Sequence, residues 1–258
     1  MRFALVSDIH GNLPALDAVL VDARSRGIST IVNLGDSLSG PLWPQETAQF
    51  LMRQRWVQLA GNHERQLLAV DPAHPEKSSP SDSYARSQVN PETLAWLATL
   101  PGTAWLGPAV FLCHGTPTSD LAYLLETVVP GSVRLAHADE IAQRLGPIDA
   151  QVIACGHTHY PRIVATQDGK LIVNPGSVGL PAYDDEHPYP HLIENGAPHA
   201  RYAICEQCEG QWFAELLAVP YDYPSAVAQA NANGRPDWAH ALATGYAQPG
   251  IAVTTIEE

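Results

Sequence analysis

The sequence predicts an α/β protein in which two packed mixed β-sheets are flanked by helices, and three observations support this prediction. The first half of the 258-residue chain alternates short β-branched runs with helical patterns, which is typical of crossover units around a largely parallel sheet. The second half carries hairpin signals, above all Asp168-Gly169 between two apolar runs. Hydrophobic residues make up 45% of the chain, enough for one sizeable core. We therefore expect a second sheet, with some antiparallel strands, packed on the first.

In the first half, the chain is expected to open with a strand over Phe3–Val6 and a helix that ends at Gly27. Asn12 can cap this helix, and Pro14 lies in its first turn, where proline is tolerated. The next expected elements are a strand over Thr30–Leu34, a helix opening at Pro44, a strand over Trp56–Leu59, and a helix over Thr93–Leu100 capped by Asn90.

In the second half, strands are expected first and helices last. The expected strands are Val110–Cys113, Gln151–Cys155, the hairpin of Ile163–Ala165 with Leu171–Val173, and the hairpin of Tyr202–Cys205 with Trp212–Leu217. Two short helical patterns then cover Ser225–Asn233 and Pro236–Ala243. We assign the hairpins to the second sheet.

The domain organisation follows from two segments, 71–83 and 180–200, in which apolar residues show neither helical nor strand periodicity. Both segments are rich in proline and polar residues. Loops of this length are usually lids or disordered insertions. We expect one domain over residues 1–220 with insertions at these two places. A helical extension should cover 221–248, and a frayed tail should cover 249–258.

Charge and composition restrict the partners and the compartment. The formal net charge of −13 argues against a nucleic-acid polymer or an anionic membrane as partner, since both require a basic face. No signal sequence and no apolar run of about 20 residues are evident, so we expect a cytoplasmic protein. Of the four cysteines, only the Cys205 and Cys208 pair has a redox or zinc spacing, and without a second such pair packing is favoured.

Polar motifs follow five of the apolar runs, and each motif ends a predicted strand. They are Ser7-Asp8-Ile9-His10, Gly35-Asp36, Gly61-Asn62-His63-Glu64, His114-Gly115 and Gly156-His157-Thr158-His159. Open α/β sheets bind ligands beyond the carboxyl ends of their strands, so these residues can converge on one site. Two carboxylates, one amide and four imidazoles are enough donors for two metal ions if one carboxylate bridges them.

In this order, the motifs resemble those of the calcineurin-like metallophosphoesterase superfamily, over residues 1 to about 220. The phrases His114-Gly115-Thr116-Pro117 and Asn174-Pro175-Gly176-Ser177 are similar to its branch of small bacterial and archaeal phosphoesterases. The resemblance implies a four-layer sandwich and a phosphodiesterase or phosphatase that uses two metal ions. By the same resemblance, His63 would face the scissile phosphate as a catalytic residue.

The ligand set that the resemblance implies divides into two groups and a bridge. Asp8, His10 and His159 would hold one ion, Asn62, His114 and His157 would hold the other, and Asp36 would bridge them. Sites rich in imidazole favour transition metals over magnesium. We expect manganese, with iron, nickel, cobalt or zinc as alternatives.

Several functions remain open at this stage. The first is hydrolysis of small phosphate esters, and the second is hydrolysis of dinucleoside polyphosphates, which needs the same ligands. A metal-binding scaffold without activity is a third. Glu64 stands where this branch usually has Asp, and in this it resembles protein Ser/Thr phosphatases. The Asp-Arg-Gly that those phosphatases carry after the metal ligand is missing after Asp36, which argues against a protein phosphatase. Segment 180–200 is expected to set substrate choice without supplying a ligand to the two ions. Its histidines His187, His191 and His199 could form an accessory metal site or touch substrate, but we favour solvated loop residues.

Overall fold

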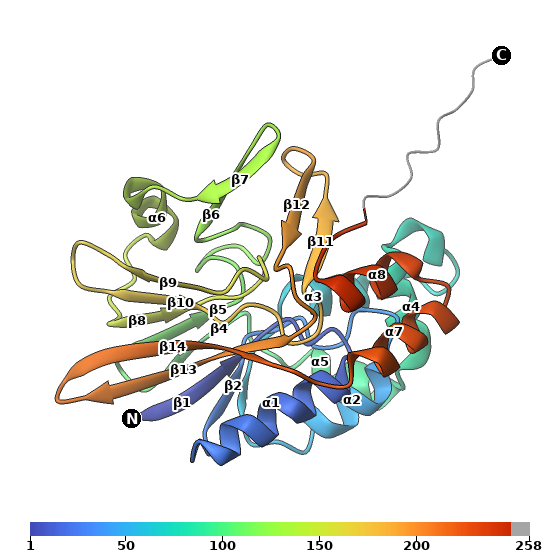
Figure 1. Ribbon diagram of the computed structural model, residues 1–258, viewed down its shortest axis with the longest axis horizontal. Coiled ribbons are helices and arrows are strands. Elements are labelled where there is room, and N and C mark those ends of the chain that lie inside the picture. The colour runs from blue at the N-terminus through green and yellow to red at the C-terminus, as the bar shows by residue number, and fades with distance from the viewer. Residues whose placement is uncertain (249–258) are drawn as a thin grey trace.

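The computed structural model describes residues 1–248, in which two five-stranded sheets lie face to face between helices (Figure 1). The first sheet has the order β14 (Gln211–Val219), β13 (Ala200–Cys208), β1 (Arg2–Val6), β2 (Ile31–Asn33) and β3 (Val57–Gln58). The second has the order β4 (Thr103–Leu106), β5 (Val110–Cys113), β8 (Val152–Ala154), β10 (Leu171–Asn174) and β9 (Arg162–Ala165). In the first sheet, β1, β2 and β3 are parallel up to one edge, and β13 and β14 add antiparallel pairs at the other. In the second sheet, the parallel pairs lie in the middle and one antiparallel pair lies at each edge. The expected α/β class with mixed sheets is confirmed.

The layers follow from the alternation of side chains along β1. Phe3 and Leu5 point into the interior between the sheets, where they join Val110 and Val152 of the second sheet. Val6 and its alternate neighbours point the other way, onto helix α1 (Leu13–Ser25). On the outer face of the second sheet, helix α6 (Ala138–Leu145) packs in the same manner. Each sheet therefore buries both faces, and its carboxyl-terminal edge is left to carry the site.

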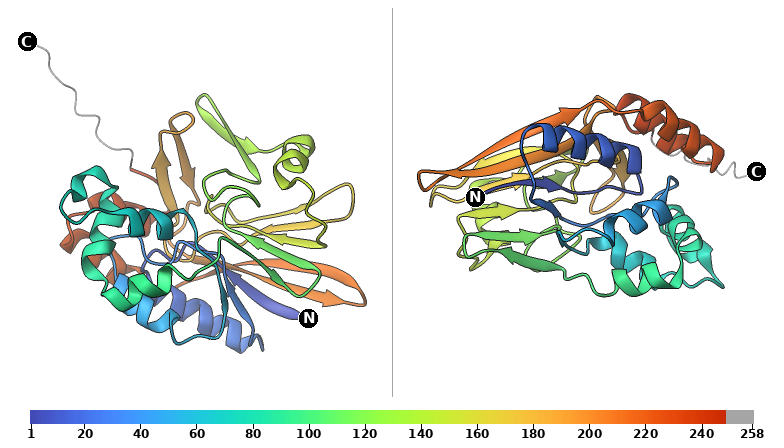
Figure 2. Two further views of the ribbon diagram at one scale, coloured as in Figure 1. Left: turned by 180° about the vertical axis from the view of Figure 1, so that it is seen from behind. Right: turned by 90° about the horizontal axis from the view of Figure 1, so that it is seen from below.

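The remaining helices gather at the carboxyl ends of the strands (Figures 1 and 2). They are α2 (Pro44–Leu51), α3 (Asn62–Ala69), the 3-10 turn η1 (Pro75–Lys77), α4 (Pro80–Gln88), α5 (Pro91–Leu97), α7 (Tyr223–Ala232) and α8 (Pro236–Thr244). Two hairpins stand beside them, β6 (Glu126–Val129) with β7 (Ser132–Leu135) and β11 (Ala182–Asp185) with β12 (His191–Glu194). Residues of β7 and β12 contact each other, so the hairpins form one wall.

Most expected elements are present near their expected bounds, but one assignment is wrong. The hairpin β13–β14 joins the first sheet, where Phe3 of β1 pairs with Cys205, and does not extend the second. The alternation of apolar and polar residues shows which residues form a strand, but it does not show which sheet edge that strand pairs with. Here Ala203 and Cys205 complete the core between the sheets, while Tyr202 and Ile204 cover α1.

The two segments without period are not the long loops that we expected. Segment 180–200 folds as the hairpin β11–β12, and segment 71–83 contains η1 and the start of α4. Strand β4, hairpin β6–β7 and helices α3 and α6 were also not expected. Helices α7 and α8 occupy the predicted extension, whereas the tail of residues 249–258 lies outside the described residues.

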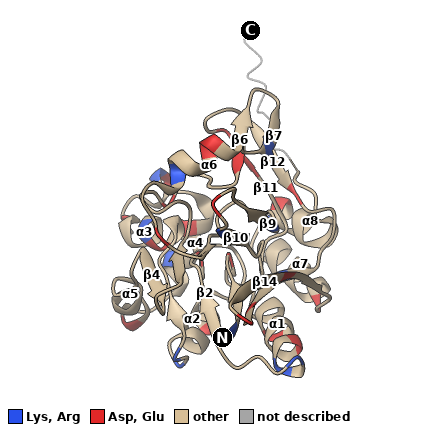
Figure 3. Cartoon of the chain, turned by 90° about the vertical axis from the view of Figure 1, so that its left-hand side faces the viewer, with Lys and Arg blue, Asp and Glu red and all other residues tan. Residues whose placement is uncertain are grey.

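Charged residues are scattered over the surface. In the view of Figure 3, acidic and basic residues lie singly on helices and loops, without a basic face. Within residues 1–248, no helix combines the length and the apolar character needed to cross a membrane. Cys205 is buried and Cys208 is exposed, and both are free thiols.

Candidate metal centre

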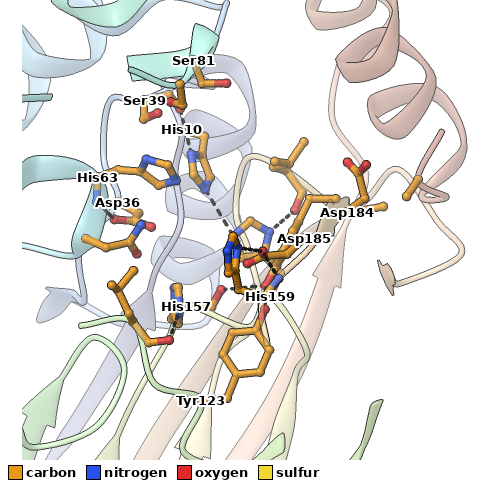
Figure 4. Close-up of a pocket in the computed structure, with 18 of the residues that line it drawn as sticks. His10, Asp36, Ser39, His63, Ser81, Tyr123, His157, His159, Asp184 and Asp185 are labelled. Carbon is orange, nitrogen blue, oxygen red and sulfur yellow. Dashed lines mark hydrogen bonds and ion pairs between the residues drawn. The ribbon is translucent and has the colours of Figure 1, made fainter. Parts of the chain in front are cut away.

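The predicted ligands lie at the carboxyl ends of five strands. Five of them line one cavity, namely His10, Asp36, Asn62, His157 and His159 (Figure 4), whereas Asp8 and His114 are buried. Asp8 and His10 follow β1, Asp36 follows β2, Asn62 follows β3, His114 follows β5, and His157 and His159 follow β8. Parallel strands end at the same edge of a sheet, so residues far apart in the chain meet there. Figure 4 shows His10, His63, His157 and His159 arranged around Asp36. The structure therefore brings the predicted site residues together.

Several of these residues have a backbone conformation that is rare outside glycine. The φ angles are 55° at Asp8, 52° at His10, 56° at Asp36, 69° at His157 and 55° at His159. Each such residue costs on the order of 1–3 kcal/mol and persists only where its surroundings over-determine it. The concentration of left-handed residues at these positions indicates that the fold holds them for function.

Glu64 provides part of that restraint. Its buried carboxylate accepts hydrogen bonds from the main-chain N–H groups of Asp36 (2.8 Å), Ser37 (2.7 Å) and Gly61 (2.7 Å). A Cβ atom at Gly61 would collide with the carboxylate of Asp36, so only glycine lets the two loops approach. Glu64, which replaces the Asp usual in this branch, therefore binds the loop that carries Asp36 directly.

The first ligand group consists of Asp8, His10 and His159, whose ligand atoms lie within 4.8 Å of one another. The Nε2 atoms of His10 and His159 are 3.2 Å apart, and Nε2 of His159 is 3.4 Å from Oδ1 of Asp8. The opposite ring nitrogens donate to main-chain carbonyls, Nδ1 of His10 to Ser39 (2.8 Å) and Nδ1 of His159 to Leu180 (2.7 Å). These bonds turn the Nε2 lone pairs toward each other.

The second group consists of Asp36, His114 and His157, with Asn62 beside them. Nε2 of His114 lies 3.1 Å from Oδ2 of Asp36 and 3.1 Å from Oδ1 of Asn62. Nδ1 of His114 donates to the carbonyl of Leu34 at 2.9 Å. As in the first group, the nitrogen that faces the site is the one without the main-chain bond.

Two of the imidazoles, those of His10 and His157, are in the neutral form that metal binding requires, whereas that of His114 is not. Burial, with the charge of His159, lowers the pKa of His10 to about 4, and burial, with the charge of His114, lowers that of His157 to about 4. Both rings are therefore neutral near pH 7, as ligands must be. Burial also lowers the pKa of His114, but Asp36 and Asp8 outweigh it and raise this pKa to about 10. In the absence of a metal ion, His114 is therefore protonated, and the proton occupies the nitrogen that would bind the metal.

The two groups together fit divalent cations. The atoms that face each other are acceptors in nearly every case, namely imidazole lone pairs, carboxylate oxygens and the oxygen of Asn62. Oδ1 of Asp8 is buried and has no hydrogen-bond partner among residues 1–248. Such a cluster is costly unless cations lie between its members. Nitrogen and oxygen donors of this kind suit transition metals.

Asp36 lies between the two groups. Its charge partly opposes the lowering of the His10 pKa in the first group, and it raises the pKa of His114 in the second. Asp8 also faces both groups, because Oδ1 is 3.4 Å from His159 Nε2 and 4.0 Å from His114 Nε2. A bridge between the two ions at Asp36 therefore stays a prediction. Asp8 is close enough to both groups to bridge them as well.

His63 is part of a pair that the sequence did not reveal. Nδ1 of His63 donates to Oδ1 of Asp82 at 2.8 Å, and the main-chain N–H of His63 donates to Asp36 at 2.9 Å. Burial lowers the pKa of His63, but Asp36 and Asp82 outweigh it and raise the pKa to about 9. Asp82 is itself buried and accepts from Ser79. In the absence of bound cations, His63 is thus protonated near neutral pH, and Nε2 is not used by the contact with Asp82. The side chain lines the cavity.

The sequence could predict the position of Asp82 in a helix but not its contact with His63. Ser79-Pro80-Ser81-Asp82 is a helix start, because Ser79 caps α4 and an acid occupies the third helical position. That signal predicts the helix. It does not predict that Asp82 meets a histidine from another strand end.

Segment 180–195 also touches the centre, although it contributes no ligand to either group. The Tyr183 hydroxyl lies 2.8 Å from that of Tyr123, which lies 3.0 Å from Nε2 of His191. The Tyr183 ring packs edge-on against His159 at 4.7 Å, and Asn195 donates to the carbonyl of His159 at 3.0 Å. His191 is buried, so its predicted solvation is wrong, whereas the His187 side chain is exposed.

Above the ligands lies a cavity of about 940 Å³, large enough for a small organic molecule. One wall is apolar, from Leu180, Ala182, Trp238 and Ala241. Its basic residues among the described part of the chain are Arg144 and Arg235, and both are engaged. Arg144 donates to the carbonyls of Leu124 and Glu126, and Arg235 binds Asp237 and Ser81.

Comparison with known proteins gives consistent results. Residues 1–193 match the model of the calcineurin-like phosphoesterase superfamily domain. An uncharacterized protein of Methanocaldococcus jannaschii is 26% identical over 254 residues, covering 91% of this chain and 94% of that protein. The crystal structure of a metallophosphoesterase from Sphaerobacter thermophilus is similar, with a TM-score of 0.74 and 25% identity over 95% of this chain and 99% of the other.

Proposed function

The chain belongs to the calcineurin-like phosphoesterase superfamily, whose model covers residues 1–193, and on this premise we propose that it hydrolyses small phosphate esters with a dinuclear metal centre. The superfamily is metal-dependent, and hydrolysis of phosphoesters is its general activity. The dinuclear centre is supported above all by the cluster of acceptor atoms that face one another. Within it, Oδ1 of Asp8 is buried and has no hydrogen-bond partner among the described residues. Two cations would satisfy this cluster.

In the proposed centre, each ligand has a defined place. Asp8, His10 and His159 would hold one ion, Asn62, His114 and His157 the other, and Asp36 both. Bound ions of this type lower the pKa of water, orient a phosphoryl group and stabilise the attacking and leaving oxygens. We favour manganese, with iron, nickel, cobalt and zinc as alternatives, because the donor set is rich in imidazole.

His63 would act on the leaving group. Asp82 fixes Nδ1 of His63, so Nε2 can donate a proton to the departing oxygen of an ester bound in the cavity. Its main-chain bond to Asp36 ties the position of this acid to the proposed bridge. Proton donation and metal binding are thus assigned to adjacent residues, His63 and Asn62, at the start of helix α3.

The cavity favours small esters over dinucleoside polyphosphates. The volume of about 940 Å³ admits both classes, so the ranking rests on the charged groups that line the cavity. Further phosphates would need free basic groups, but Arg235 is paired with Asp237 and Arg144 is held by carbonyls. We therefore rank polyphosphate hydrolysis second and a metal-binding scaffold without activity third.

The test is a screen of one purified sample against phosphomonoesters, phosphodiesters and a dinucleoside polyphosphate. The protein is stripped with a chelator and then reconstituted with manganese, zinc, cobalt or nickel in turn. We expect no activity after chelation and the highest rates on esters with a single phosphate. Metal binding without hydrolysis of any class would support the scaffold instead, and preference for the polyphosphate would reverse the ranking.

A further inference from the structure

We propose, resting on the dinuclear centre of the proposed function, that helices α7 and α8 position the first ligand group and set its affinity for metal. These helices come from the end of the described chain, far in sequence from any ligand. Figure 1 shows α8 next to the hairpin β11–β12, and Arg235 before α8 donates to the hydroxyl of Ser81 in α4. The inference depends on three sets of contacts.

The first contact is made by Trp238 of α8. Its ring packs edge-on against the imidazole of His10, with ring centroids 5.7 Å apart and an interplanar angle of 79°. Trp238 also lies against Gly40, where an added Cβ would be 2.6 Å from the indole and 2.9 Å from the carbonyl oxygen of His10. The guanidinium of Arg235 lies over the Trp238 ring, 5.6 Å from its centroid, and Arg235 is anchored by Asp237.

The second contact restrains the loop that orients His10. Residues 39–42 run past His10, and the carbonyl of Ser39 accepts its Nδ1–H at 2.8 Å. Asn233, at the end of α7, donates to the carbonyl of Pro41 in the same loop at 2.7 Å. The side chain that binds the metal and the carbonyl that orients it are therefore both held from the C-terminal helices.

The third contact is shared apolar burial. The cluster formed by Trp238, Ala226 and Leu242 of the two helices includes Leu42 and Leu180. Leu42 belongs to the loop that orients His10, and the carbonyl of Leu180 accepts Nδ1–H of His159 at 2.7 Å. Both histidines of the first group are thus oriented by segments that pack on α7 and α8.

The second group has no such dependence. His114 is oriented by the carbonyl of Leu34 and His157 by that of Leu121. Leu34 lies in the core between the sheets, and Leu121 is exposed. Loosening of α7 and α8 should therefore weaken one ion and leave the other unchanged. Residues that orient metal ligands typically change metal affinity by about 10- to 100-fold when they are replaced.

The experiment combines Trp238→Ala with single-ligand variants in a titration of metal-free protein with manganese, read by calorimetry. In a His114→Ala background the remaining ion belongs to the first group, and Trp238→Ala should weaken its binding by about 10- to 100-fold. In a His10→Ala background the remaining ion belongs to the second group, and the same change should have no effect. Trp238→Phe keeps an aromatic edge against His10 and should restore most of the affinity.

Two controls keep the outcome interpretable. Trp212→Ala removes an indole that packs on Phe3, outside the site, and should leave both affinities unchanged. If Trp238→Ala does not fold, Asn233→Ala, which removes only the bond to Pro41, should still weaken the first ion selectively. Equal weakening of both ions, or none in any variant, would overturn the inference. A wild-type protein that binds no ions would instead refute the proposed dinuclear centre.

Discussion

The geometry around His63 fits its proposed role in phosphate chemistry, because its Nδ1 is occupied by Asp82 while the side chain lines the cavity. We predict that His63→Ala keeps both ions but lowers kcat by about 10²- to 10⁴-fold, as expected for a positioned acid. The loss should be smaller for nitrophenyl esters, whose leaving group needs no proton, than for alkyl esters. Metal analysis and rates on both ester types check this, and equal losses would reduce His63 to a positioning role.

Asp82 acts through His63, so its removal should give a weaker form of the same defect. Asp82→Asn retains the shape of the side chain but removes the charge that holds the Nδ1–H of His63. We expect kcat to fall by about ten- to a hundredfold on alkyl esters, with metal content unchanged. In the double variant with His63→Ala, the change at Asp82 should have no further effect. Additive losses would mean that Asp82 acts by another route.

Glu64 is expected to matter for stability more than for any chemical step. Its carboxylate accepts three main-chain hydrogen bonds, from Asp36, Ser37 and Gly61. Glu64→Ala would leave these buried donors unpaired, which should lower the free energy of unfolding by about 3 kcal/mol or more. Denaturant unfolding of the metal-free protein measures this change. Glu92→Ala on α5, an exposed site, is the matched control and should change stability by less than about 0.5 kcal/mol.

At the scale of elements, the hairpin β11–β12 is predicted to set substrate choice. Asp184, Asp185 and His187 line the cavity, whereas Tyr183 and Asn195 hold His159 from the same segment. Replacing residues 185–190 by a tight turn should therefore change the relative rates among esters but keep both ions. Deletion of all of 182–194 should also weaken metal binding, because Tyr183 is lost. An unchanged order of preference in the shorter variant would contradict the role of the hairpin.

The elements also show how far the sequence determines this site. The strand ends after Val6, Asn33 and Cys113 could be predicted, because apolar runs stop there at polar motifs, and the ligands follow directly. The partner of His63 could not, since Asp82 reaches it only through the placement of α4. The same limit applies to Trp238, which meets His10 across more than two hundred residues of chain. Local patterns predict which residues lie at the strand ends, whereas long-range packing determines what orients them.

At the scale of the whole molecule, the net charge of −13 is compatible with the proposed binding of phosphate esters, because the charge at the site is set locally. Two carboxylates, Asp8 and Asp36, lie in a cluster that would hold two divalent cations, so the site itself would be positive. Acidic residues elsewhere are dispersed over the surface (Figure 3). Local charge at the centre, not the total charge, therefore decides what binds there.

The central claim is that the chain holds two ions joined by Asp36, and metal stoichiometry tests it most directly. Protein stripped with a chelator and saturated with manganese should contain two ions per chain by elemental analysis. Asp36→Asn should retain the fold but lose at least one ion, because the repulsion between two close cations is then less well compensated. A saturating content of one ion or none in the wild type, or two tightly bound ions in Asp36→Asn, would contradict the account.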